Sequence, residues 1–236
     1  MRRFRFPEDG DVAGDIREKY DFDGELLDIF TGNEDIVVHK WHHYIPIYDR
    51  YFSRFRGTKV RFLEIGINKG GSLQMWRNYF GPDAVIYGID INEECAQFNG
   101  KSAQVRIGSQ ADPEFLNKVI DEMGGVDVVL DDGSHRMKHV RASFEMIFPR
   151  VEPHGVYMVE DLHTAYLEKF GGGYATKSNF FFFLRQIVDD MHRWYHKKGK
   201  RHPGLGDQVS GMHIHDSIAV IEKHPTHRPV HSRVGR

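Results

Sequence analysis

The chain has 236 residues, a length that fits one medium-sized domain with some additional segments. With 40% hydrophobic and 28% charged residues, its composition is that of an ordinary soluble globular protein. A formal net charge of −2 argues against general binding to nucleic acid or to an anionic membrane, because those functions usually need a strong basic excess.

The sequence also indicates a location. The start, MRRFRFPEDGD, is basic but lacks the apolar core of a signal peptide, and no apolar run approaches the roughly 18 residues of a membrane span. The single cysteine, Cys95, excludes an intrachain disulfide and fits a reducing compartment. We therefore expect a cytoplasmic protein.

The first segments are an arm and a helix. Residues 1–37 are polar and acidic and are predicted to form an N-terminal arm, with one amphipathic stretch at 24–30. Residues 39–55, HKWHHYIPIYDRYFSRF, carry apolar or aromatic side chains at nearly helical spacing, so a helix is expected there.

From residue 60 onward, apolar strand patterns alternate with helical patterns. The predicted strands are 60–66, 84–91, 103–109, 126–132 and 155–161. The predicted helices are 72–80, one starting at 93–98, 113–123 and 137–151. This alternation predicts an α/β fold with a doubly wound, mainly parallel sheet.

The remainder departs from this rhythm. Residues 162–211 are predicted to be an insertion with an aromatic helix, residues 212–223 a single alternating strand, and residues 224–236 a loosely held tail. Phe180–Phe183 and Trp194 are candidates for a lid or an acceptor wall, and plain core or an oligomer contact is the alternative. The basic segment HKKGKRH (196–202) is interpreted as a solvated loop.

The first strand–helix turn, FLEIGINKGGS (62–72), is rich in glycine but is not a GxGxxG motif. Asp90 ends the next predicted strand, 24 residues after Gly66 (90 − 66), where an acid accepts hydrogen bonds from ribose hydroxyls. Ser109 and Gln110 follow the third strand and could reach an adenine edge. Glu64 also lies at the carboxyl end of its strand, where ligands of such sheets bind. Capping of the following helix is the alternative role for Asp90.

Two acidic pairs end the fourth and fifth strands. The first pair is Asp131 and Asp132, and the second is Glu160 and Asp161. Asp132 and Glu160 are 28 residues apart (160 − 132), which is about the length of one strand–helix–strand crossover. If the two strands are neighbours, so many carboxylates need a cation, and oxygen ligands favour Mg²⁺, with Mn²⁺ or Ca²⁺ as alternatives. Helix capping remains the alternative for Asp131 and Asp161.

His135 follows Asp132 after Gly133 and Ser134. It is suited to accept a proton from a hydroxyl group, and the alternative is a surface histidine at the start of a helix.

The glycine-rich turn and Asp90 together resemble the S-adenosylmethionine site of class I methyltransferases. The chain as a whole resembles the metal-dependent sugar O-methyltransferases, those of macrolide sugars such as the mycinamicin enzymes and those of mycobacterial polysaccharides. The likeness covers about residues 38–223. It rests on the motifs HKWHHYIPIYDRYF, FLEIGINKGGS, YGIDI, VVLDDGSH, MVEDLH and HDSIAVIEK.

The resemblance implies a Rossmann-like class I methyltransferase fold and a role for each site residue. The implied metal ligands are Asp132, Glu160 and Asp161, and the implied general base is His135. The residues assigned to S-adenosylmethionine are Gly66, Asp90 and Ser109, with Tyr44 or His43 closing over it, together with Glu64 and Ser72 of the first turn. Asp131 is assigned a structural or cofactor-side role.

The implied reaction is methyl transfer to a hydroxyl of a sugar, with a small-molecule or oligosaccharide acceptor and a homo-oligomeric enzyme. Three alternatives stay open. They are methylation of a non-sugar vicinal diol such as a catechol, a metal-dependent hydroxylase on the same fold, and a non-catalytic module that binds S-adenosylmethionine.

Overall fold

The structure is a computed structural model that describes residues 10–235. The chain divides into two compact units, Met1–Ile107 and Gly108–Arg236, so the expected arm does not form a separate unit. Within the described residues, no helix has the length and apolar character needed to cross a membrane.

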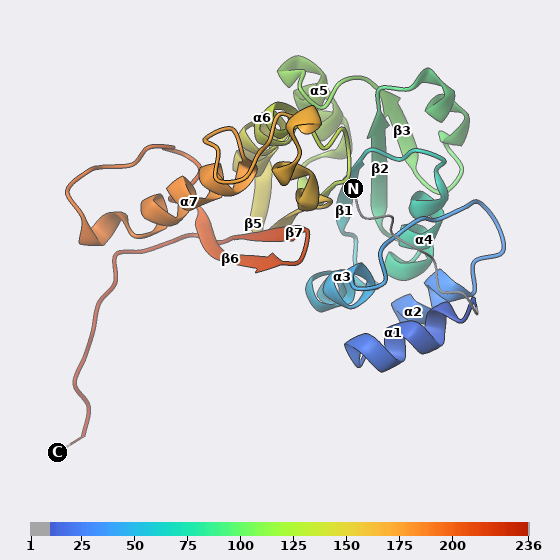
Figure 1. Cartoon of the computed structure of the whole chain (residues 1–236), viewed down its shortest axis with the longest axis horizontal. Coiled ribbons are helices and arrows are strands. Elements are labelled where there is room, and N and C mark those ends of the chain that lie inside the picture. The colour runs from blue at the N-terminus through green and yellow to red at the C-terminus, as the bar shows by residue number, and fades with distance from the viewer. Residues whose placement is uncertain (1–9, 236) are drawn as a thin grey trace. The chain divides into compact units, whose positions relative to one another are not determined.

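The first unit contains a three-stranded parallel arrangement in the order β3-β2-β1 (Figure 1). Its strands are β1 (Arg61–Ile65), β2 (Val85–Asp90) and β3 (Gln104–Ile107). Its helices are α1 (Val12–Tyr20), α2 (Glu25–Thr31), α3 (Tyr44–Phe52) and α4 (Gly71–Phe80). Residues 93–98 form a 3-10 helix where the start of an α-helix was expected.

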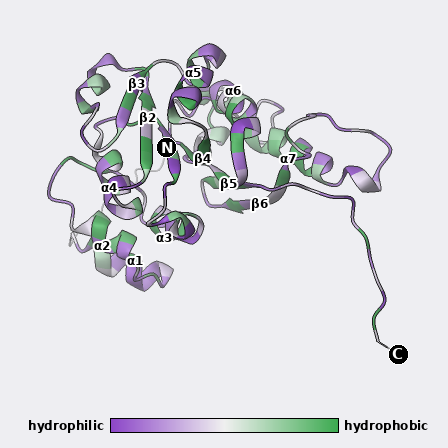
Figure 2. Cartoon of the chain, turned by 180° about the vertical axis from the view of Figure 1, so that it is seen from behind, coloured by the Kyte–Doolittle hydropathy of each residue, from purple (hydrophilic) through white to green (hydrophobic). Residues whose placement is uncertain are grey.

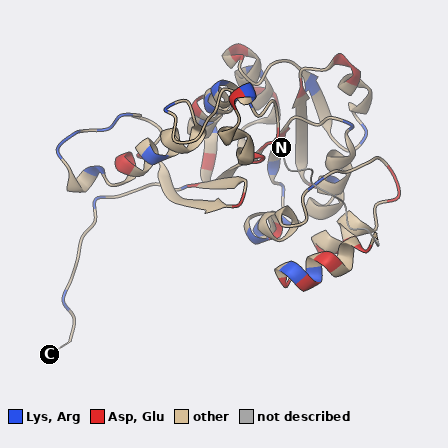
Figure 3. Cartoon of the chain, in the orientation of Figure 1, with Lys and Arg blue, Asp and Glu red and all other residues tan. Residues whose placement is uncertain are grey.

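Helices α1 and α2 occupy much of the predicted arm, and only α2 was anticipated. Asp11 caps α1 by accepting a hydrogen bond from the backbone N–H of Gly14 at 2.8 Å. Both helices bury apolar side chains completely, Ile16 from α1 and Leu26 and Leu27 from α2. The described part of the arm is therefore packed onto its unit. Residues of both charge signs lie along α1 (Figure 3). Residues 1–9 lie outside the described part.

An aromatic core fills the first unit. Phe52 from α3, Phe62 from β1, and Trp76 and Phe80 from α4 have ring centroids 5.0–6.2 Å apart. Aromatic pairs at these separations add to the free energy gained by burying their area. Strand β2, which is largely hydrophobic in Figure 2, continues this core.

The second unit has four strands in the order β4-β5-β7-β6. They are β4 (Val126–Asp131), β5 (Val151–Val159), β6 (Val209–His215) and β7 (Ile218–Lys223), and the β4–β5 pair is parallel. The helices are α5 (Pro113–Met123), α6 (Met137–Ile147) and α7 (Phe180–Met191). Helix α6 ends earlier than expected, in a 3-10 turn that contains Pro149, so β5 begins at Val151.

The single strand expected over residues 212–223 is wrong. The structure forms an antiparallel hairpin, with β6 and β7 joined by Asp216 and Ser217 (Figure 1). Ser217 has a φ of 65°, in the left-handed region that a tight turn requires. The alternating pattern predicts extended chain correctly but does not show where the chain reverses.

The aromatic run in α7 divides between core and surface. Phe180 and Phe183 are buried with Leu184 and Ile187, whereas Phe182 is 38% exposed. Trp194, beyond the helix, is 42% exposed. The following basic loop is anchored, because the buried carboxylate of Asp190 accepts hydrogen bonds from the backbone N–H groups of Arg201 and His202 at 2.8 and 2.7 Å.

Candidate active site

The two aspartates at the end of β4 have opposite environments. The side chain of Asp131 is buried, and it accepts hydrogen bonds from Ser143 Oγ at 2.6 Å, Tyr157 Oη at 3.0 Å and Gln110 Nε2 at 3.0 Å. Burial raises the pKa of this carboxyl, and the donors around it oppose the shift. Asp131 therefore joins β4, β5 and α6 inside the unit.

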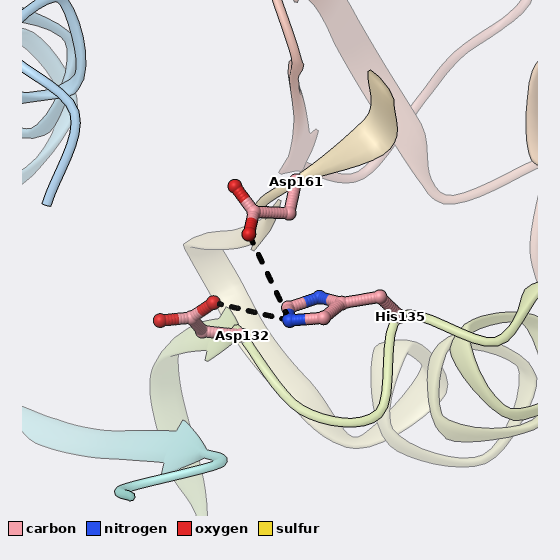
Figure 4. A group of neighbouring side chains, drawn as sticks. All are labelled: Asp132, His135 and Asp161. Carbon is pink, nitrogen blue, oxygen red and sulfur yellow. Dashed lines mark ion pairs between the residues drawn. The ribbon is translucent and has the colours of Figure 1, made fainter. Parts of the chain in front are cut away.

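Asp132 turns the other way and meets two further side chains. Its Oδ1 lies 3.9 Å from His135 Nε2, and Asp161 Oδ2 lies 3.7 Å from the same nitrogen (Figure 4). The side chains are partly exposed, at 23% for each aspartate and 24% for His135. Two carboxylates thus face one imidazole nitrogen from the ends of β4 and β5, with access to a ligand.

Both His135 and Asp161 adopt left-handed backbone conformations, each with φ at 55°. Such conformations cost free energy for residues with a Cβ, although Asp and His tolerate them better than most. Thr164 supports both residues, because its Oγ1 lies 2.6 Å from the carbonyl oxygen of Asp161 and 3.4 Å from that of His135. The backbone strain is thus concentrated at His135 and Asp161, the two residues whose side chains meet.

Gln110 fixes the loop between Asp132 and His135. Its Oε1 accepts a hydrogen bond from the backbone N–H of Ser134 at 2.6 Å while its Nε2 donates to Asp131. The side chain is 7% exposed, and these bonds engage both ends of its amide. Gln110 therefore ties the loop to the buried Asp131, a role different from the adenine contact expected from the sequence. Ser109 Oγ accepts from the N–H of Ala111 at 3.2 Å.

The turn of the β6–β7 hairpin holds the segment after β5. Ser217 accepts at its carbonyl oxygen from the N–H of Leu162 at 2.8 Å, and its Oγ accepts from the N–H of His163 at 3.1 Å. The same hydroxyl lies 2.8 Å from His163 Nδ1. His163 Nδ1 is also 3.9 Å from Asp161 Oδ1. The hairpin therefore positions the residues next to Asp161.

Glu160, the third expected metal ligand, is placed differently. Its side chain is 2% exposed, and its backbone N–H donates to the carbonyl oxygen of Asp131 at 2.9 Å. The metal-competent group found within residues 10–235 consists of Asp132, His135 and Asp161, whose ligand atoms lie within 4.8 Å of one another. A ligand role for Glu160 stays a prediction.

In the first unit, Asp90 organises the glycine-rich turn. Its Oδ2 accepts hydrogen bonds from the backbone N–H groups of Ile67 and Asn68 at 3.0 and 3.1 Å, and its Oδ1 accepts from Asn92 at 2.9 Å. Gly66 begins the turn with φ at 85°, a conformation that favours glycine. Asp90, the acid predicted to bind the cofactor, therefore lies against the backbone of the glycine-rich turn that was predicted to bind it too.

Glu64 and Ser72 contact each other rather than solvent. The carboxylate of Glu64, which is fully buried, accepts hydrogen bonds from Ser72 Oγ at 2.8 Å and Trp76 Nε1 at 3.3 Å. Lys40 Nζ lies 4.0 Å away and supplies a compensating charge. These contacts tie β1 to α4, and contact with a cofactor stays a prediction for both residues. Tyr44 is likewise fully buried, with its ring centroid 4.6 Å from that of His43.

Four residues of the site escaped the sequence analysis in their observed roles: Gln110, His163, Thr164 and Ser217. Two of them lie in the quoted motif MVEDLH or directly after it, and Ser217 lies in HDSIAVIEK. Those motifs were the available signal. The roles of His163 and Ser217 could not be predicted from those motifs, because the two residues contact each other across 54 positions of the sequence.

Comparison with protein families gives a match to a methyltransferase domain over residues 63–162. Demethylmacrocin O-methyltransferase of Streptomyces fradiae is 39% identical over 78% of this chain and 50% of its own length. Mycinamicin VI 2''-O-methyltransferase of Micromonospora griseorubida is 37% identical over 77% of this chain and 48% of its own. The chain spans about half the length of the curated relatives it matches.

Solved structures confirm the expected fold. MycE methyltransferase from the mycinamycin biosynthetic pathway, in complex with Mg and SAH, has a TM-score of 0.73 at 33% identity over 80% of this chain and 51% of its own. The same enzyme with Mg, SAH and mycinamycin VI has a TM-score of 0.72 at 34% identity, over 80% of this chain and 50% of its own. This likeness establishes the doubly wound, mainly parallel α/β fold of class I methyltransferases. Over the part that the matches cover, the chain belongs to the family of S-adenosylmethionine-dependent sugar O-methyltransferases.

Proposed function

We propose that this protein transfers a methyl group from S-adenosylmethionine to a hydroxyl of a sugar, with a divalent cation at Asp132 and Asp161 and with His135 as the base. The observation that carries the proposal is the meeting of Asp132, His135 and Asp161 within 4.8 Å at the ends of two parallel strands. Relatives named as O-methyltransferases of glycosylated natural products support the reaction class.

The donor set fits a hard cation. Asp132 and Asp161 offer carboxylate oxygens that are partly exposed, and Mg²⁺ is usually held by one or two carboxylates together with water and substrate oxygens. A relative solved with Mg supports this choice of ion. When bound, the cation supplies orientation of sugar hydroxyls and a lower pKa for one of them.

In the proposed reaction, the hydroxyl oxygen forms the new bond to the sulfonium methyl carbon as the carbon–sulfur bond breaks. His135 Nε2 accepts the hydroxyl proton, and S-adenosylhomocysteine leaves. This nitrogen lies 3.9 Å from Asp132 Oδ1 and 3.7 Å from Asp161 Oδ2, so the base stands beside the two carboxylates that would hold the cation. Holding the reacting groups in line supplies much of the acceleration.

For the cofactor, we propose that the turn starting at Gly66 and Asp90 of the first unit serve S-adenosylmethionine, and Ser109 and Asp131 of the second unit stay predicted cofactor residues. The three amides on the carboxylate of Asp90 support a preformed turn in the first unit. Tyr44, Glu64 and Ser72 are buried and would act by shaping this turn. Homo-oligomerisation and a cytoplasmic location stay predictions.

Methyl transfer from labelled S-adenosylmethionine to a panel of glycosides, with Mg²⁺ or with EDTA, tests the proposal. We expect activity that EDTA abolishes. We also expect His135→Ala to remove activity while keeping the thermal shifts caused by S-adenosylmethionine and by Mg²⁺, with the exposed His192→Ala as the control. Activity that survives EDTA excludes the cation. Loss of the Mg²⁺ shift in His135→Ala would make the histidine a ligand instead of the base.

A further inference from the structure

A cavity of about 360 Å³ in the second unit lies beside the candidate active site. It is formed at the N-terminal ends of α6 and α7 and by the segment that contains Phe170. Two contacts connect it with the active site. The ring of Phe170 has its centroid 6.3 Å from that of His135, and His139 Nδ1, in the cavity wall, lies 3.0 Å from Ser134 Oγ.

The wall of this cavity is strongly cationic. It includes Arg136, Lys138, Arg141 and Lys177, and no aspartate or glutamate is among its lining residues. Arg141 is engaged, since its guanidinium donates to Glu145 at 2.8 and 2.9 Å. Among the described residues, the other three cations make no ion pair. Clustered unpaired cations at a concave surface raise the local concentration of anions.

The wall of the cavity also contains three phenylalanines. Phe180 and Phe183 are buried at 1% and 3% exposure, and they form its apolar part together with Phe170. The guanidinium of Arg141 lies 4.7 Å from the centroid of the Phe183 ring, which holds that side chain in place. Figure 3 shows the basic residues at the start of α6 in blue, in the part of the chain that directly follows His135. The cavity thus combines apolar rings with exposed positive charges.

We propose that this cavity binds the part of the acceptor next to the methylated sugar, and that this part carries an anionic group, a phosphate or a carboxylate. This rests on the proposed function. The anion would be held by Arg136, Lys138 and Lys177, and the apolar face of the saccharide would lie on the partly exposed ring of Phe170. An anion placed there aligns the neighbouring sugar with Asp132 and His135. A neutral macrolide glycoside, by contrast, would leave three cations without partners.

The first test is direct binding, measured by isothermal titration calorimetry on the full chain without cofactor. The probes are glucose 6-phosphate, glucuronate and neutral methyl glucoside. We expect at least one anionic sugar to bind about tenfold or more tightly than the neutral one, with affinity that falls as salt rises. Comparison of the phosphate with the carboxylate identifies the anion. Equal affinity for all three probes overturns the proposal.

Variants locate the binding. Arg136→Gln and Lys177→Gln, both at exposed positions, should each weaken binding of the preferred anionic sugar about tenfold. Lys197→Gln removes an equal charge from the same unit outside the cavity and should leave it unchanged. An equal loss in Lys197→Gln would mean general charge attraction and would overturn the cavity assignment.

The outcomes also separate this proposal from the proposed function. Methyl transfer to neutral glycosides with no preference for anionic ones would overturn the anionic acceptor and leave the methyltransferase reaction standing. Binding of an anionic sugar that depends on Arg136 and Lys177, without any methyl transfer in the presence of S-adenosylmethionine and Mg²⁺, would support the cavity and contradict the reaction.

Discussion

At the scale of single residues, the adjacent Asp131 and Asp132 have opposite roles because successive side chains of a strand point to opposite sides. Asp131 enters the interior, where three side chains donate to it, and Asp132 stays accessible opposite His135. Gln110 connects these two environments, since its amide bonds both Asp131 and the backbone of Ser134. It is therefore a positioning residue for the loop that carries His135.

Gln110→Met tests this positioning role. The substitution keeps the size of the side chain but removes the bond to the Ser134 N–H, so the loop should loosen. We expect kcat to fall on the order of 10- to 100-fold, the size of effect typical when a hydrogen bond that supports the residues of a metal site is lost. Steady-state kinetics with the preferred glycoside measure this change.

The matched control is Ser143→Ala. It also removes a donor to the buried Asp131, at a cost of about 1–3 kcal/mol in stability, but it keeps the bond to Ser134. If Ser143→Ala lowers kcat as much as Gln110→Met at a similar loss of stability, the effect comes from the interior and the positioning role is disproved.

At the scale of elements, the β6–β7 hairpin does more than extend the sheet. Its turn residue Ser217 makes three contacts with Leu162 and His163, directly after Asp161. The turn therefore takes part in holding Asp161 in its left-handed conformation.

Ser217→Gly isolates the hydroxyl contacts from backbone strain, because glycine accepts a φ of 65° more readily than serine. We expect little loss of thermal stability but an affinity for Mg²⁺ that is lower by about tenfold, measured by titration with Mg²⁺. Ser210→Ala, which removes a hydroxyl bond to the Glu222 carbonyl elsewhere in the hairpin, should leave the affinity unchanged. Unaltered Mg²⁺ binding in Ser217→Gly would show that the turn does not support the site.

At the scale of the whole molecule, a ligand that binds only the folded state stabilises it in proportion to the logarithm of its concentration. At about 100 times its dissociation constant, Mg²⁺ should add about 2.7 kcal/mol to the free energy of unfolding. For a chain of this size, that corresponds to roughly 5–10 °C in Tm. Thermal melts with Mg²⁺ and with EDTA measure the difference.

Asp132→Asn should abolish this stabilisation by Mg²⁺, because the amide removes a negative charge from the carboxylate pair. Asp189→Asn is the control, since Asp189 is a carboxylate on α7 that pairs with Arg185 outside the site. A full Mg²⁺ shift in Asp132→Asn would place the cation elsewhere.

Much of the fold followed from local patterns. Strand ends at Asp90, Asp131 and Val159 lie within two residues of the predicted ends, because apolar runs stop where the chain leaves the interior. The reversal at Ser217 and the helix α1 were missed, since short polar segments carry weak periodicity. The match to family structures confirms the sheet type that the alternation predicted.

The sequence by itself determined which residues could meet: acids at the ends of β4 and β5, a histidine one short turn later, and glycines with Asp90 at the first turn. Only the tertiary structure decided which acids face a ligand. It buried Asp131 and Glu160, exposed Asp132 and Asp161, and brought in Gln110 and Ser217 from distant positions. The reason is physical. Strand patterns fix where a side chain leaves the backbone, whereas burial and hydrogen bonding depend on neighbours from other parts of the chain.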